Sequence, residues 1–86
     1  MKNKDEIRVW LFFPTEGKMV EAVLPLSASF HDCLIHLNEM LQPEFHGSFR
    51  LDRYSVFMTA KDNIPLSSSV TLSRLNLYDG IRIVVY

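Results

Sequence analysis

The chain has 86 residues, which is room for one domain, and 48% of them are hydrophobic, enough to fold without disulfides or a structural metal. The formal net charge of −1 argues against a general nucleic-acid binder, because phosphate binding normally needs an excess of basic side chains. The single cysteine excludes an internal disulfide and the apolar runs are only strand-length, so we expect a cytoplasmic protein without direct membrane insertion.

A β-hairpin is predicted near the start of the chain. EIRVWLFF, residues 6–13, is rich in β-branched and aromatic residues, and turn residues follow it. Alternation along this strand predicts that the odd-numbered side chains share one face and that Arg8, Trp10 and Phe12 share the other. KMVEAVLPL, residues 18–26, is the returning strand. We expect residues 1–5 to be a short flexible N-terminus.

One helix is predicted after the hairpin. Ser29 is placed to cap it, with Asp32 three residues later in a variant of the capping box. Pro43 is expected to end the helix. The residues that recur at helical spacing on its apolar side are Phe30, Cys33, Leu34, Leu37 and Leu41.

The second half of the chain predicts shorter elements. RLDRYSVFMTA, residues 50–60, reads as a third strand and is followed by a tight turn at KDN. IPL is predicted to be a short edge strand, because Pro65 cannot donate to a sheet ladder. TLSRLNL is predicted to form a helical turn, and an Asp-Gly step leads into the last strand, IRIVVY, at residues 81–86.

This order of elements, in so short a chain, resembles the β-grasp fold of ubiquitin-like proteins. VTLSRLNLYDGIRIVVY is similar to the closing segment of those domains, and LSASFHDCLIHL is similar to the Ser-capped start of their helix. The predicted class is α+β: a mixed sheet of four to five strands with one helix packed on one face, spanning residues 6–86 as a single domain.

A narrower resemblance rests on VFMTAKDNIPL followed by LNLYDGIRIVVY. These segments are most similar to the small ubiquitin-like accessory proteins, of YukD or EsaB type, that accompany bacterial type VII secretion systems. That resemblance implies an accessory or regulatory role exerted by contact. It also implies a protein partner, such as a secretion ATPase or a membrane component.

Chemical activity of the chain's own is not predicted. In HDC, residues 31–33, adjacent helical side chains point about 100° apart, and Cys33 lies on the apolar stripe. His36 and His46 lack partners at metal-ligand spacing, and no Gly-rich phosphate loop or carboxylate pair appears. We therefore expect no enzyme, no catalytic residue, no cofactor and no metal.

The best-known function of ubiquitin-like proteins is conjugation, their covalent attachment to other proteins. It needs an extended terminal glycine whose carboxylate enters another enzyme's active site. Here Tyr86 follows Val84 and Val85 directly in the last predicted strand. We expect that this sequence is not conjugated.

The remaining candidate is a surface. In a β-grasp domain the first and last strands lie side by side and parallel, so Arg82, Val84 and Tyr86 would join the outer side chains of the first strand. Phe57 joins them if its odd-numbered neighbours on the third strand face outward. Aromatic and arginine side chains in one patch favour partner binding. The predicted partner-binding residues are Arg8, Trp10, Phe12, Phe57, Arg82, Val84 and Tyr86.

Several alternatives stay open. Residues 1–5, or the loop around Phe45 and Phe49, would cover Trp10 and Phe12 in one of them. A strand slip of one residue would exchange the two faces. The patch would also suit a homodimer or, as a stacking platform, a single-stranded nucleic acid, although no nucleic acid is expected from the charge. A small non-catalytic subunit of an enzyme complex is a further alternative.

Overall fold

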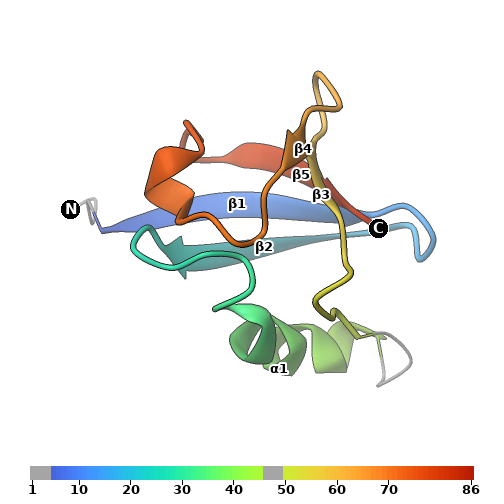
Figure 1. Ribbon diagram of the computed structural model, residues 1–86. Coiled ribbons are helices and arrows are strands. Elements are labelled where there is room, and N and C mark those ends of the chain that lie inside the picture. Colours follow the sequence, from blue (N-terminus) through green and yellow to red (C-terminus); the bar gives the residue numbers. More distant parts are fainter. Residues whose placement is uncertain (1–4, 46–49) are drawn as a thin grey trace.

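The structure, a computed structural model, describes residues 5–45 and 50–86, and their backbone forms a five-stranded mixed sheet with one α-helix (Figure 1). The strand order is β2-β1-β5-β3-β4. This is the predicted β-grasp arrangement. The elements in chain order are β1 Glu6–Phe13, β2 Lys18–Pro25, α1 Leu34–Phe45, β3 Phe57–Thr59, β4 Pro65–Leu66, the 3₁₀ helix η1 Leu72–Arg74 and β5 Ile81–Val85.

The centre of the sheet is the parallel pair of β1 and β5. Val9 is opposite Ile81 and Leu11 is opposite Ile83, and all four side chains are buried on the side that α1 covers. A short turn delivers β5 to this position: the Gly80 N–H donates to the Arg8 carbonyl at 2.7 Å, and Gly80 has a φ of 87°, which favours glycine. The prediction that the first and last strands are parallel neighbours is confirmed.

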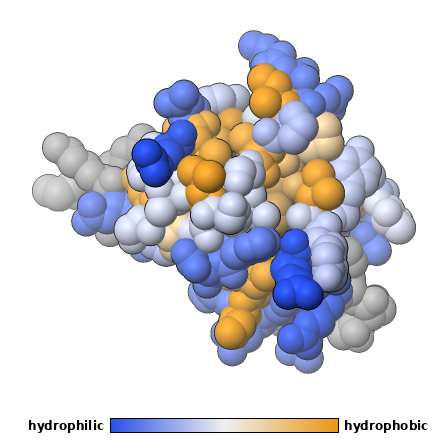
Figure 2. Space-filling model, viewed as in Figure 1, coloured by the Kyte–Doolittle hydropathy of each residue, from blue (hydrophilic) through white to orange (hydrophobic). Residues whose placement is uncertain are grey.

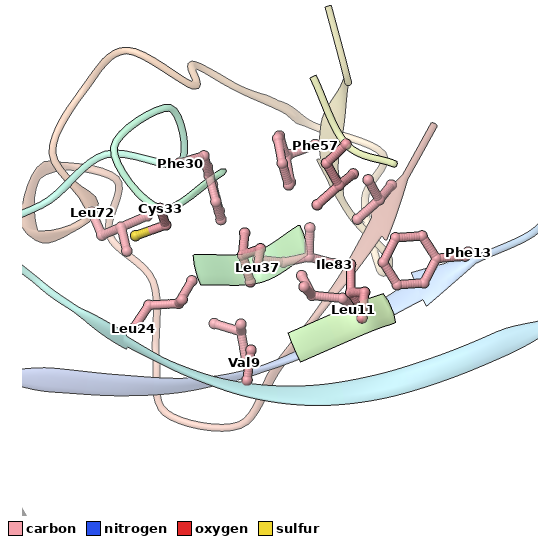
Figure 3. Close-up of a cluster of buried hydrophobic side chains, with 14 of the residues drawn as sticks. Val9, Leu11, Phe13, Leu24, Phe30, Cys33, Leu37, Phe57, Leu72 and Ile83 are labelled. Atoms are coloured by element: carbon pink, nitrogen blue, oxygen red, sulfur yellow. The ribbon is translucent and has the colours of Figure 1, made fainter. Parts of the chain in front are cut away.

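The core lies between the sheet and α1 (Figure 3). Phe30, from the turn before the helix, stacks on Phe57 of β3 with ring centroids 4.2 Å apart and rings 4° from parallel. Phe13 meets Phe45 edge to face at 5.1 Å. These two aromatic pairs join the start and the end of the helical segment to the sheet.

The predicted capping box at the start of the helix is confirmed. Ser29 Oγ accepts the Asp32 N–H at 3.1 Å, and Asp32 Oδ2 accepts the Ser29 N–H at 3.0 Å. The next bonds, from Cys33 and Leu34, reach back only three residues, so the first turn is tight and the α-helix itself begins at Leu34. Neither helix within residues 5–45 and 50–86 has the length and apolar character needed to cross a bilayer.

Two predicted boundaries are wrong. The helix passes through Pro43 and ends at Phe45, because proline in a last turn removes one hydrogen bond while its fixed φ still suits a helix. The third strand begins at Phe57 rather than residue 50, because local bonds hold the preceding segment in a turn. In that turn, Asp52 Oδ1 accepts the Tyr54 N–H at 2.8 Å and Ser55 Oγ accepts the Asp52 N–H at 3.0 Å.

Candidate partner-binding surface

One face of the sheet lies opposite the helix, and its side chains come from every strand. On β1 the outward side chains alternate with the buried ones, as predicted for Trp10 and Phe12, which are both half-buried. The strand register places Phe12 beside Met19 of β2 and Val84 of β5, and Val84 beside Met58 of β3. Side chains directly opposite each other across strands contact on the same face. An apolar row therefore crosses the sheet: Met19, Phe12, Val84, Met58 and, on β4, Pro65.

Exposed apolar side chains border this row. Tyr86 is 64% exposed and Val56 46%, and their backbones exchange hydrogen bonds of 2.9 and 3.0 Å at the end of β5. Met19, at the β2 end of the row, is 48% exposed. Exposed apolar groups in one continuous patch favour a partner site. We define the open-face patch as Trp10, Phe12, Met19, Val56, Met58, Val84 and Tyr86.

Charged side chains flank the patch beside Trp10. The register puts Trp10 between Glu21 of β2 and Arg82 of β5. Arg8 forms ion pairs with Glu21 at 3.4 Å and with Asp79 at 3.6 Å, so its charge is largely balanced within the fold. Among residues 5–45 and 50–86, the Arg82 side chain has no ion-pair or hydrogen-bond partner. Arg82 is therefore the cation of this flank that remains available to a partner.

Of the seven predicted surface residues, the structure brings six together on the outer face: Arg8, Trp10, Phe12, Arg82, Val84 and Tyr86. The expected place of Phe57 is wrong, because this side chain is 1% exposed and stacks on Phe30 in the core. Its neighbours Val56 and Met58 face outward instead. The strand is only three residues long and follows a turn, so alternation counted from residue 50 does not extend to it.

Sequence reasoning missed Met19, Val56 and Met58. A signal for Met19 was present, because Met19, Glu21 and Val23 alternate along β2 with the more buried Val20, Ala22 and Leu24. For Val56 and Met58 there was no such signal, because the side of the sheet that residues around a short strand face depends on where the preceding turn ends.

Cover of the patch from within the described chain is limited. Phe45 packs on Phe13 in the core, on the other side of the sheet, so the alternative in which it shields Trp10 is wrong. Asp5 continues β1, since its carbonyl accepts the Leu26 N–H at 2.8 Å. Phe49 and residues 1–4, which that alternative also invoked, lie outside the described residues.

The candidates for chemistry lie elsewhere. Cys33 is 4% exposed, and burial together with the Asp32 carboxylate raises the pKa of its thiol. His31 Nε2 lies 3.0 Å from Ser68 Oγ and 3.3 Å from the Arg53 carbonyl, in a contact between loops. Over residues 5–45 and 50–86, His, Cys, Asp and Glu form no group of three or more that could hold a metal ion. His46 lies outside the described residues.

No family model and no curated protein matches the sequence. Solved structures do match it. The ubiquitin-like domain of EccD5 from Mycobacterium xenopi aligns with a TM-score of 0.71 and 17% identity, over 94% of this chain and 92% of that one. The chain has the ubiquitin-like β-grasp fold. The ubiquitin-like domain of the type VII secretion system protein EccD1 from Mycobacterium tuberculosis aligns with a TM-score of 0.67 and 18% identity, over 93% and 95% of the two chains.

Other neighbours place the β-grasp fold in larger assemblies. A chain of the MycP5-free ESX-5 inner membrane complex, State II, aligns with a TM-score of 0.72 and 18% identity over 95% of this chain. This protein spans only 21% of that chain's length. A chain in the toluene 4-monooxygenase HD complex aligns with a TM-score of 0.65 and 13% identity, over 95% of its own length. At these identities the likeness shows the fold alone.

Proposed function

We propose that this β-grasp domain docks a protein partner through the open-face patch, as an accessory or regulatory component of a type VII secretion apparatus in the bacterial cytoplasm. The observation that carries the docking proposal is the apolar row across the sheet, bordered by exposed Tyr86 and Val56. The secretion assignment is supported by the EccD domains among the structural neighbours and by the resemblance to YukD- and EsaB-type proteins. The partner class is a secretion ATPase or membrane component.

The patch suits docking because its anchors are largely held in place before a partner arrives. Trp10 and Phe12 are half-buried among their cross-strand neighbours, so little side-chain freedom is lost on binding. Arg82 lies beside Trp10 and is free to meet an acidic group of the partner, which would set orientation. Arg8 contributes less than the sequence suggested, since Glu21 and Asp79 already hold it.

The test is a pull-down from lysate of the host, with captured proteins identified by mass spectrometry. Trp10→Ala should weaken capture of a secretion ATPase or membrane component about tenfold or more, because an anchoring aromatic contributes roughly 2 kcal/mol. Arg82→Glu added to it should abolish capture. Ile35→Ser is the matched control, since Ile35 is exposed on α1, away from the sheet face, and this change should leave capture intact.

Circular dichroism must first show that all variants are folded. If Trp10→Ala captures the same partner as wild type, the open-face proposal fails. If only Ile35→Ser loses the partner, the site lies on the helix instead.

A second candidate is a small non-catalytic subunit of an enzyme complex. The observation in its favour is the toluene 4-monooxygenase neighbour, a chain of similar length with the same fold. The same pull-down separates the two candidates, because an enzyme subunit rather than a secretion component would then be lost with Trp10→Ala.

A further inference from the structure

A groove of about 790 Å³ lies beside the start of β5, outside the apolar row. One wall is the turn between β3 and β4, and the other is the segment from the end of η1 to β5. Figure 2 shows hydrophobic side chains gathered in this region, at the top of the view between the β3–β4 turn and the segment that follows η1. The groove exists because β3 pairs with β5 only from Ile83 onward, so the turn diverges from Ile81.

The walls of the groove are apolar and partly open to solvent. Ile64 and Tyr78 both line the groove, and these large side chains are 52% and 62% exposed. Leu66, Leu75 and Leu77 line it and are half-buried against the core. The volume falls within the range of about 300–1,000 Å³ that is typical of ligand sites.

Both walls are held by hydrogen bonds before any ligand enters. Thr59 closes the β3–β4 turn: its N–H donates to the Ile64 carbonyl at 3.0 Å and its hydroxyl accepts the Ile64 N–H at 3.0 Å. On the other side, the Leu72 N–H donates to the Ala28 carbonyl at 2.8 Å and the Gly80 N–H donates to Arg8. Binding in a groove whose walls are already ordered loses little conformational entropy.

The charges at the mouth favour an anion. Lys61 and Arg82 both line the groove, and their backbones are close, because the Ala60 N–H donates to the Arg82 carbonyl at 3.0 Å. Across residues 5–45 and 50–86, neither of these two side chains has a hydrogen-bond or ion-pair partner. Asp62 is the one acid among the lining residues, so the rim keeps a net positive charge.

We propose that this groove binds an extended segment of a protein that carries an acidic side chain next to large apolar ones. The carboxylate would meet Lys61 and Arg82, and the apolar side chains would lie between Ile64, Leu77 and Tyr78. Arg82 also borders the open-face patch, so a partner lying on the patch reaches the groove without a gap. The choice of a protein segment as the occupant rests on the proposed function. The apolar walls and the charged mouth of the groove are features of the structure and do not depend on that function.

The probe is a capped peptide, GSDLILSG, titrated into the full ¹⁵N-labelled chain and followed by amide chemical shifts. Shifts should change at Ile64, Leu77 and Tyr78, which line the groove. The matched peptide GSKLILSG should bind about tenfold more weakly, because it replaces a charge-assisted contact by repulsion. Ile64→Ser should weaken binding about tenfold, and Lys61→Gln several-fold. Arg50→Gln is the control for charge, and Trp10→Ala should leave peptide affinity unchanged.

Three results would overturn the groove proposal: no shift change at millimolar peptide, equal binding of the lysine peptide, or shifts confined to Phe12, Met19 and Val84. None of these results decides the proposal for the open-face patch, because the pull-down that tests it does not depend on Ile64 or Lys61. Conversely, peptide binding that survives Trp10→Ala supports the groove even if the pull-down finds no partner for the patch.

Discussion

Asp32 stabilises the start of the helical segment through its capping hydrogen bonds with Ser29 and through the negative charge of its carboxylate. Its carboxylate accepts the Ser29 N–H, and this bond, with a second contribution from the Ser29 hydroxyl, lowers the pKa of Asp32 below its ordinary value. A carboxyl whose pKa is lower in the folded state stabilises that state above its unfolded pKa. The stabilisation is lost as the pH falls through the folded pKa.

Asp32→Asn should therefore flatten the acid dependence of stability. We expect urea unfolding of the wild type to lose more free energy than that of the variant between about pH 6 and about pH 2, because only the wild type loses the charged cap. Glu39→Gln is the control, since the Glu39 carboxylate has no partner in the parts of the chain that the structure describes. Parallel pH profiles for wild type and Asp32→Asn would contradict this account.

At the scale of elements, β3 decides which side chains belong to the core. Phe57 is opposite Val85 and points toward the helix, whereas Met58 is opposite Val84 and points away from it. The parallel stack of Phe57 on Phe30 fixes this orientation, since a slip of one residue would expose the phenyl ring and bury Met58.

Substitution of these two neighbours should separate core from surface. Phe57→Ala should lower the free energy of unfolding by about 3–5 kcal/mol, a large part of the stability of a domain this size. Met58→Ala should change it by about 1 kcal/mol or less, because a half-buried side chain leaves no closed cavity. Urea titration measures both. Similar losses in the two variants would mean that the strand does not hold one fixed face.

The sequence predicted the elements whose pattern is long. Eight residues of alternation placed Trp10 and Phe12 correctly, and the Asp79–Gly80 step marked the start of β5. It could not predict the segment before β3, which depends on a contact distant in sequence: Asn38 bonds both backbone groups of Leu51, at 2.7 and 2.9 Å. No local pattern in a sequence distinguishes an asparagine that holds a loop from a solvated one.

At the scale of the whole molecule, one core supports two distinct surfaces. The core joins every strand to the helix, β4 through the half-buried Leu66, so we infer that residues 6–86 behave as one cooperative unit. Probes of different parts of the fold should then give the same urea midpoint of unfolding. Suitable probes are far-ultraviolet circular dichroism, Trp10 fluorescence and the amide signals of Leu24 and Leu37. Trp10 lies on the open face and the other two in the core, so separate midpoints would show that the sheet and the helix unfold independently.

The parallel pairing of β1 with β5 also sets an order of events for the newborn chain. Arg8 and Asp79, which meet at the start of this pair, are 71 positions apart in sequence. The hairpin of β1 and β2 closes over a short turn and needs only residues 6–25 to have left the ribosome. Its inner strand then waits, with one edge unpaired, until β5 has been translated. Contacts of such long range slow folding, so this waiting hairpin is the stage at which the nascent protein is most exposed to strand-to-strand aggregation.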